Sequence, residues 1–147
     1  MRNLKENIII QEYINWNRFG VLLGMDFTIP QAGEVIYTMK VTEDMLATPF
    51  AAHGGSVAAL LDATLGVACL SQVCEDLKVV STVNISIQYM SPACLNDVLT
   101  ATGKVIKAGN RILFVEGKVV NQDEVLIATA SATMNAYPVA KISEKLK

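Results

Sequence analysis

The sequence is poor in the residues that mark several large classes of protein. Its 147 residues include 1 histidine, 3 cysteines and 4 prolines, and 18% of them are charged. A single histidine excludes a histidine-based zinc site, and an odd number of cysteines argues against a disulfide framework. With 12 basic and 14 acidic residues the net charge is −2, so the chain as a whole offers no basic surface for nucleic acid. The hydrophobic share of 52% is enough to close a folded core.

Signals for export or membrane insertion are also missing. The polar start of the chain includes Glu6, and the apolar run 8–10 is too short for the core of a secretory signal. The segment 54–74 has the length of a bilayer span, but Asp62 and three glycines interrupt it. The cysteines lie in apolar surroundings, which predicts buried thiols in a reducing compartment: Cys69, Cys74 and Cys94. We therefore expect a cytoplasmic protein that binds neither a membrane nor a nucleic acid.

No repeat or flexible linker divides the chain, so we expect a single domain over residues 1–147, with a helical extension at 1–20. Apolar residues at helical spacing predict an amphipathic helix over 8–19 that ends near Gly20. The elements expected after it are strands 21–29 and 34–41, a loop 43–52, a helix from 56 to about 73, and strands 82–90, 97–107, 111–121 and 125–136.

The helix expected from 56 to about 73 is apolar on nearly every side, which predicts a helix buried all round. In the strand after it, one face is predicted to be buried: Val83, Ile85, Ile87 and Tyr89. This order of elements predicts an α+β fold, with a curved antiparallel β-sheet wrapped around a central apolar α-helix. Because one sheet leaves part of such a helix bare, we also expect self-association.

The chemistry is concentrated in His53, Gly54 and Gly55, just before the apolar helix, and in Asp62 inside it. Glycines allow close backbone approach, and N–H groups at the start of a helix can stabilise an oxyanion. An acid in an apolar helix needs hydrogen-bond partners or an interface cavity, and beside an oxyanion site it can act as a general base or nucleophile. The structural alternatives are a simple entry turn for the glycines, a structural Asp62 and a loop histidine without chemistry.

These residues resemble the signature of hotdog-fold acyl-CoA thioesterases, in particular the PaaI-like group of the thioesterase superfamily. The run 84–93, with its Tyr-Met-Ser-Pro motif, resembles the strand that follows the helix in that family, and the likeness covers about residues 20–136. The resemblance implies a hotdog fold and hydrolysis of acyl-CoA to the free acid and CoA. It also implies a homodimer with paired sheets, often assembled into a homotetramer, with active sites at the subunit interface.

The resemblance also implies a role for each site residue. Asp62 would be the nucleophile or the general base for water, the Gly54 N–H would polarise the thioester carbonyl, and Thr82 would assist as the hydroxyl on the following strand. His53 and Gly55 would shape the substrate site rather than transfer protons.

Coenzyme A would enter as part of the substrate, and we expect neither a cofactor nor a metal. Its phosphates would need cations, and four candidates surround the hairpin at 107–111: Lys104, Lys107, Arg111 and Lys118. Among these, Lys107 and Arg111 are taken as the substrate-binding candidates.

One position departs from the family pattern. The family often has an asparagine six residues before the histidine, and this chain has Ala47 there. This departure keeps a second function open, namely a non-catalytic hotdog module that binds acyl-CoA as a sensor or carrier partner. A hotdog dehydratase is the weaker third alternative, because His53 lies in the wrong motif for the catalytic histidine of such enzymes.

Overall fold

The computed structural model describes residues 3–145, including the side chains of residues 3–142. Residues 1–2 and 146–147 of the expected domain lie outside the described residues. Six strands form one antiparallel sheet in the order β1-β2-β4-β5-β6-β3. They are β1 (Asp26–Gln31), β2 (Glu34–Lys40), β3 (Lys78–Tyr89), β4 (Val98–Ala108), β5 (Ile112–Val120) and β6 (Leu126–Pro138).

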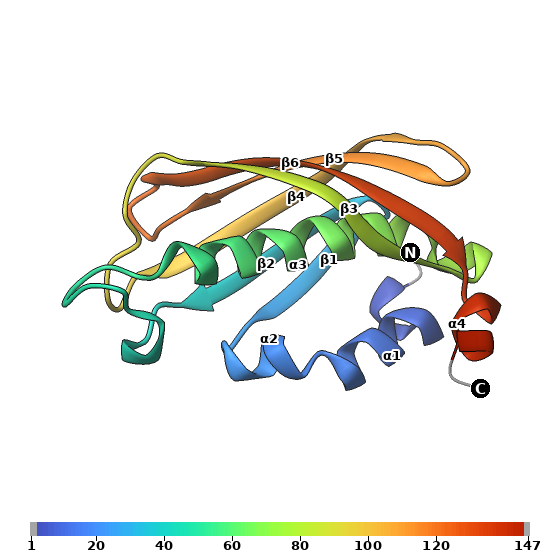
Figure 1. The fold of residues 1–147 in the computed structure, drawn as a ribbon, viewed down its shortest axis with the longest axis horizontal. Helices are drawn as coiled ribbons and strands as arrows, with labels where there is room; N and C mark the ends of the chain where they lie inside the picture. Colours follow the sequence, from blue (N-terminus) through green and yellow to red (C-terminus); the bar gives the residue numbers. More distant parts are fainter. Residues whose placement is uncertain (1–2, 146–147) are drawn as a thin grey trace.

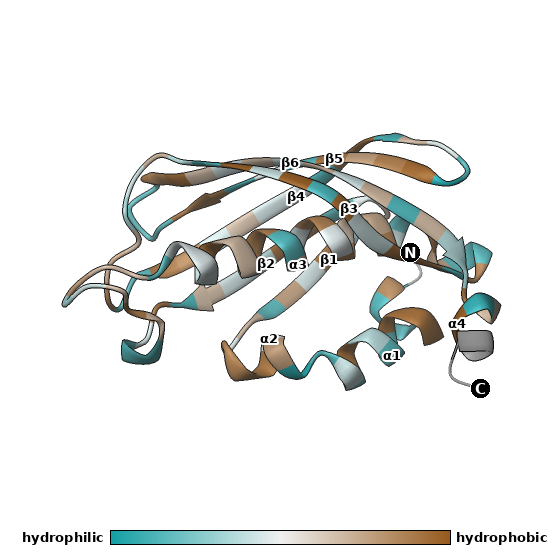
Figure 2. Cartoon of the chain, in the orientation of Figure 1, coloured by the Kyte–Doolittle hydropathy of each residue, from teal (hydrophilic) through white to brown (hydrophobic). Residues whose placement is uncertain are grey.

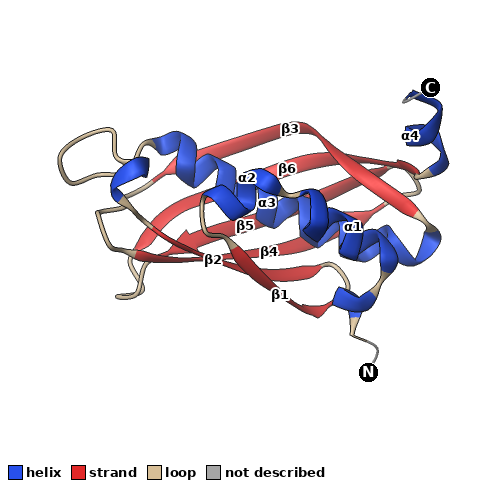
Figure 3. Ribbon diagram, turned by 90° about the horizontal axis from the view of Figure 1, so that it is seen from below, coloured by secondary structure: helices blue, strands red, loops and turns tan. Residues whose placement is uncertain are grey.

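The sheet curves around one long helix, α3 (Gly54–Val73), which lies along its concave side (Figure 1, Figure 3). Two short helices, α1 (Ile8–Trp16) and α2 (Arg18–Leu22), lie on the same side of the sheet as α3, and α4 (Ala140–Lys145) follows β6. The predicted curved sheet around a central helix is confirmed, as is the order of its elements.

The N-terminal helical segment differs from the prediction of one helix over 8–19. Asn17 ends α1, because its N–H donates to Tyr13 O at 2.9 Å. The same residue begins α2, because its side-chain oxygen accepts from Gly20 N–H at 3.1 Å. Asparagine is a preferred cap, so it breaks a pattern that looks continuous in the sequence. The strand expected from 21 is also too long, since α2 extends to Leu22 and β1 begins at Asp26.

The core lies between α3 and the sheet. Leu60, Leu61 and Leu65 of α3 are fully buried. Gly117 of β5 lets the helix approach the sheet closely, because a Cβ atom there would lie 2.8 Å from Leu65 Cδ2. On the inner face of β6, Ala128, Ala130, Ala132 and Met134 are buried, and a register shift with β5 buries Ile127 and leaves Leu126 exposed.

The opposite face of α3 is not covered by the sheet, so the prediction of a helix buried all round is wrong. Gly55 and Asp62 are exposed on this face, while Ala59, Ala63 and Gly66 are half-buried. The sheet can cover one side of a helix only, and α1 and α2 cover part of the other (Figure 3). The helix is long and apolar enough to cross a membrane, but 67% of its most hydrophobic window is buried within the fold.

Strand β3 forms an edge of the sheet, because only β6 pairs with it. Its predicted inner face is partly wrong: Ile85 and Ile87 are half-buried as expected, but Val83 is 62% and Tyr89 53% exposed. Val83 is turned outward by a β-bulge, since Thr82 pairs with Met134 and Asn84 with Thr133. An edge strand with an exposed apolar residue is a surface on which another strand can pair.

The cysteines follow the prediction only in part. Cys69 and Cys74 are buried, and burial raises the pKa of the Cys69 thiol to about 12. Cys94 is exposed, because it lies in the loop between β3 and β4 rather than in the core.

Candidate functional site

Asp62 and Thr82 come together across the gap between α3 and β3. Thr82 donates its hydroxyl hydrogen to Asp62 Oδ1 at 2.7 Å. This bond supplies the hydrogen-bond partner expected for the acid, and the Asp62 side chain is exposed in the single chain. No backbone amide among the described residues donates to it. Its second oxygen is therefore available to a water molecule or a substrate.

The β-bulge at Val83 gives Thr82 its direction. From Ile85, which faces α3, strict alternation would turn Thr82 away from the helix. The extra residue resets the alternation, so that Thr82 lies opposite the buried Met134 and faces α3. Bulges often re-aim a side chain beside a functional site, and this one positions the hydroxyl that binds Asp62.

A groove of about 870 Å³ runs along α3 beside Asp62. One face of α1, at helical spacing, forms the opposite wall: Ile9, Glu12, Tyr13 and Trp16. Residues of β3, β6 and α4 complete it, and most of the lining is apolar. A groove of this size and lining is typical of a binding site for a small apolar molecule.

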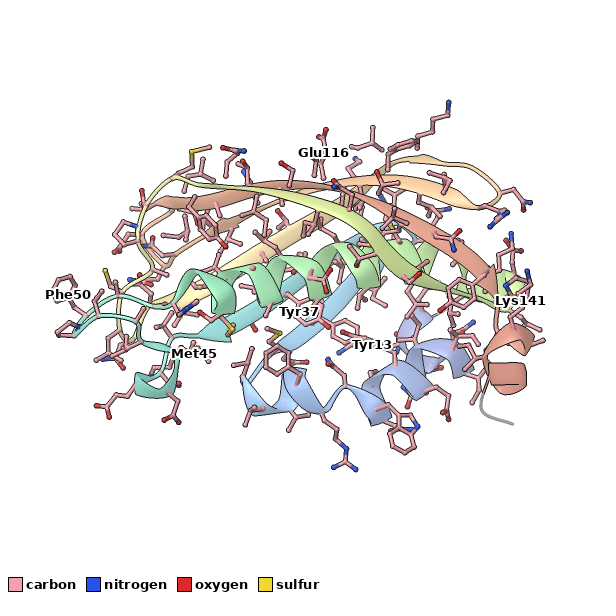
Figure 4. All side chains as sticks on the ribbon, viewed as in Figure 1. Tyr13, Tyr37, Met45, Phe50, Glu116 and Lys141 are labelled. Carbon is pink, nitrogen blue, oxygen red and sulfur yellow. The ribbon has the colours of Figure 1, made fainter. Side chains whose placement is uncertain are left out.

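Two tyrosines below the groove were missed by the sequence analysis. The hydroxyl of Tyr13, which lines the groove, lies 3.0 Å from that of the fully buried Tyr37 (Figure 4). Burial raises the pKa of both phenols, and the nearby charge of Asp62 adds to the effect at Tyr13. The pair therefore stays neutral at pH 7 and anchors α1 to the sheet. No local pattern links residues 24 positions apart, so the sequence carried no signal for it.

The predicted oxyanion donor lies at the start of α3. His53 caps the helix, because its Nδ1 accepts from Gly55 N–H at 2.8 Å and its carbonyl accepts from Ser56 N–H at 2.9 Å. A Cβ atom at Gly55 would lie 2.9 Å from His53 Nδ1, so this cap requires glycine. The Gly54 N–H has no acceptor among the described residues. It is therefore the amide of this turn that remains available to a ligand.

Tyr89, at the other end of β3, holds this turn in place. Its hydroxyl donates to Gly54 O at 2.9 Å, and its ring lies over Gly54. The two residues share a small groove of about 300 Å³ with Met90 and Pro92. Tyr89 was predicted to lie on the buried face of its strand, but it instead positions the glycine turn.

The structure does not bring Asp62 and Gly54 together within one chain. They are eight residues apart on one helix, which separates them by about 12 Å along its axis. Both cannot touch one carbonyl group at that distance. The predicted catalytic residues thus form two half-sites, Asp62 with Thr82 and Gly54 with Tyr89.

The predicted cations lie at a third place. Lys107 and Arg111 are exposed at the β4–β5 hairpin, which Lys78 contacts by donating to Asn110 O at 3.0 Å. Lys78 and Tyr89 are the two ends of β3, about 36 Å apart, so the hairpin is far from Gly54 (Figure 1). The other two candidates, Lys104 and Lys118, lie along β4 and β5 away from the hairpin, and Lys104 pairs with Glu34 at 2.9 Å.

Ala47 lies in the loop before α3, where its N–H donates to Ala51 O at 3.0 Å. Its exposed methyl group offers no polar contact in place of the family's asparagine side chain.

Among the described residues, no three His, Cys, Asp or Glu side chains are grouped as a metal site would require. A second groove, of about 860 Å³, crosses the outer face of the sheet near Ile36 and Gly117, and two of the four cation candidates, Lys104 and Lys118, line it.

Comparison with known proteins agrees with this geometry. The model of the family described as "Thioesterase superfamily" matches residues 51–128. Over 106 residues the chain is 32% identical to acyl-coenzyme A thioesterase PaaI of Escherichia coli (strain K12), which covers 72% of this chain and 73% of that protein.

Solved structures show the same architecture. The structure of the E. coli PaaI protein matches 92% of this chain and 94% of its own, with a TM-score of 0.83 and 24% identity, which shows the fold. A hypothetical thioesterase from Streptococcus pneumoniae, solved with coenzyme A, matches 78% of this chain and 86% of its own, with a TM-score of 0.71 and 26% identity.

Proposed function

The chain belongs to the thioesterase superfamily, and we infer that it hydrolyses acyl-CoA thioesters to the free acid and coenzyme A. The observation that carries this inference is the Asp62 carboxylate, bound by one hydroxyl and open to a large apolar groove. An exposed acid beside an apolar groove can meet a thioester whose acyl group lies in that groove.

In the proposed reaction, Asp62 acts on the carbonyl carbon of the thioester. As a general base it accepts a proton from water while the water oxygen bonds to that carbon; as a nucleophile it forms a transient anhydride that water then cleaves. Either path places negative charge on the carbonyl oxygen, which an N–H such as that of Gly54 can stabilise. The carbon–sulfur bond then breaks, and the CoA thiolate takes up a proton. Thr82 holds the carboxylate in position.

We propose that each active site is built from two copies of the chain. Asp62 and Gly54 lie about 12 Å apart in one copy, but an antiparallel second α3 can place its own Gly54 opposite Asp62. The two-fold axis would then pass near Ala58, midway between them. The exposed face there is made of small residues, Gly55 and Ala59 among them, so the helices can approach closely.

The edge strand supports the same arrangement. Thr82 accompanies Asp62 and Tyr89 accompanies Gly54, so the same axis would place Tyr89 of the second copy opposite Thr82. The edges of two β3 strands would then pair antiparallel over this stretch and extend the sheet. The helix contact and the strand pairing are thus compatible with a single two-fold axis.

Complementation between two inactive variants tests the two-copy site. Asp62→Asn removes the base, and Gly54→Pro removes the N–H at the first position of the helix, where proline is tolerated. His53 has ψ 131°, which suits a residue before proline. The two variants are co-expressed with different tags and purified through both tags, so that each dimer contains one copy of each. Such a mixed dimer has two sites, of which one is intact. We expect about half of the wild-type rate of thiol release per pair.

Gly54→Ala is the matched control, because it keeps the N–H, and its Cβ atom would make an ordinary contact with the Tyr89 ring at 3.4 Å. It should retain most of the activity. If the purified mixed pairs are as inactive as either parent, the two-copy site is wrong. If Asp62→Asn alone cleaves acyl-CoA at the wild-type rate, the role of Asp62 is wrong.

Ala47 favours a second candidate function, a non-catalytic module that binds acyl-CoA as a sensor or carrier partner. The exposed alanine supplies no side-chain contact to a reacting group. Tight binding of acyl-CoA by the wild-type chain, without thiol release from any acyl-CoA tested, would favour this candidate over the hydrolase.

The remaining expectations concern location, assembly and co-reactants. We propose a cytoplasmic location, supported by three cysteines without a disulfide in the described part of the chain. We also propose that dimers assemble further into a tetramer, which the mass of the complex in solution tests. We propose that water is the co-reactant and that no cofactor takes part, because Asp62 supplies the base and the Gly54 N–H supplies the polarising group. Lys107 and Arg111 remain candidates for binding the phosphates of CoA.

A further inference from the structure

Gly66 stands out in the floor of the Asp62 groove. It lies one helical turn after Asp62 on the same face of α3, about 6 Å along the axis. A Cβ atom built on Gly66 would meet no other atom within 4 Å. The position therefore opens onto free space inside the groove.

Packing does not explain this glycine. At Gly117, an added Cβ would lie 2.5 Å from Thr102 O, so that position requires glycine for the approach of α3 to the sheet. No such neighbour exists at Gly66, which sits in the middle of a 20-residue helix. Glycine in a helix interior shifts the folding equilibrium toward the unfolded state by a factor of about two to five relative to alanine. The chain bears this cost at a place where a larger residue would fit.

The space kept open is apolar. Beyond Asp62 the groove continues past Gly66 to Leu70, with Val67 and Val80 beside it and Trp16 of α1 across from them. α1 lies under this second half of α3 in both views of the fold (Figure 1, Figure 3). In the hydropathy colouring, α1 carries both hydrophobic and hydrophilic segments (Figure 2). Apart from Asp62 and Thr82, the polar lining residues are Glu12, Tyr13 and Ser81.

We propose that the acyl group of the substrate lies in this groove, and that Gly66 is the specificity-determining residue that admits acyl groups longer than acetyl. This proposal rests on the proposed function, since it takes Asp62 as the point at which the thioester carbonyl is held. The occupant is an apolar acyl chain, because aliphatic walls without paired polar groups favour buried methylene groups.

The test measures both cleavage and binding. Thiol release is measured for a series of straight-chain acyl-CoAs from acetyl to dodecanoyl, and Kd is measured for the matching S-alkyl-CoA thioethers, which cannot be hydrolysed. For the wild type, affinity should rise by about fourfold per methylene until the groove is full. Gly66→Leu should lower kcat/KM and affinity for the long members by about 30-fold or more, and change those for the acetyl member by less than about twofold.

Two further variants separate this effect from a structural one. Gly66→Ala should raise the midpoint of urea unfolding, because alanine favours the helix, and yet lower kcat/KM for the longest substrates. Gln72→Leu, an exposed position on α3 outside the groove lining, adds similar apolar surface and should leave the length profile unchanged.

The outcomes distinguish the two proposals. Cleavage of acyl-CoAs with the same length profile in wild type and Gly66→Leu would overturn the role of Gly66 and leave the proposed function standing. An equal loss on every member, acetyl included, would also overturn it, because the groove would then hold something other than the acyl group. Length-dependent thioether binding that Gly66→Leu abolishes, without cleavage of any acyl-CoA, would uphold the groove and refute hydrolysis.

Discussion

The two carboxylates that matter in this chain are held in opposite ways. Asp97, in the loop before β4, is 8% exposed. One of its oxygens accepts from Cys94 N–H at 2.8 Å and the other from the Gln122 side-chain amide at 2.9 Å. Asp62, on α3, is exposed and accepts one hydrogen bond, from the Thr82 hydroxyl.

The difference separates an acid suited to a structural role from one suited to the proposed reaction. A buried carboxylate is tolerated when donors satisfy both oxygens, and such a group is not free to act on anything else. Asp97 meets that description and fastens the loop to the β5–β6 connection through Gln122. Asp62 keeps an oxygen directed to solvent and groove, which a structural role would not require. We therefore expect substitution of Asp62 to lower activity and substitution of Asp97 to lower stability.

Asp62→Asn should show the largest effect, and on activity alone. Asparagine still accepts from Thr82 but cannot accept a proton or attack, so kcat should fall by about 10²–10⁴-fold. The free energy of unfolding should change by less than about 0.5 kcal/mol, because the site is exposed. Thiol release and urea unfolding of the same preparation measure both. A loss of stability comparable to that of a core substitution would break the contrast with Asp97.

Asp97→Asn should do the reverse. The amide of asparagine presents an NH₂ group to one of two donors, so one buried hydrogen bond is lost, and unfolding should become easier by about 1–3 kcal/mol. The rate of thiol release per folded molecule should stay within about twofold of wild type. Asp44→Asn, at an exposed position, serves as the control and should leave stability unchanged. An unaltered urea midpoint for Asp97→Asn would contradict the structural role.

Thr82→Val sharpens the description of the Asp62 half-site. Valine has nearly the same shape and removes only the hydroxyl, so kcat/KM should fall by about tenfold, the value of one hydrogen bond to a charged group. Thr82→Ser restores the hydroxyl and should recover most of the rate. A valine variant as fast as wild type beside a slower serine variant would show that Thr82 acts through its shape.

The smallest expected effect concerns the pair formed by Tyr13 and Tyr37 beside the groove. Like Asp97, Tyr37 is buried. Burial raises the pKa of Tyr37 and of Tyr13, whereas tyrosines in the unfolded chain titrate near 10. Above that pH the unfolded state loses protons that the folded state keeps, so stability falls as pH rises, by up to about 1.4 kcal/mol per pH unit for each tyrosine. Tyr37→Phe should make this fall shallower.

Urea unfolding of wild type and Tyr37→Phe between about pH 9 and 11 measures that difference. Parallel curves for the two proteins would mean that other groups cause the alkaline loss.

Much of this fold was predictable because its signals are local. The apolar run of α3, the alternation within β4 to β6 and the hairpin after Ala108 each depend on neighbouring residues, and the structure confirms these elements. The family resemblance, which depends on His53 to Asp62 and on Tyr89, is confirmed by the match to the thioesterase superfamily.

The predictions that failed share one cause: each depends on contacts between residues that are distant in the chain. Asp97 was not recognised as the buried acid, because Gln122 lies 25 positions away. Tyr89 was assigned to the core, because its partner Gly54 precedes it by 35 positions. Val83 was assigned to the inner face, because a bulge depends on the register with β6 rather than on the sequence of β3 alone.

The amino-acid order alone thus determined most of the helices and strands and the curved sheet around an apolar helix, and it singled out Asp62, Gly54 and Gly55 as candidates for the chemistry. These follow from periodicity and residue type, which act over a few residues. The tertiary structure decided that Asp62 is open and Asp97 enclosed, and that the bulge turns Thr82 toward Asp62. Such facts depend on how distant segments pack in space, and packing is a property of the folded chain.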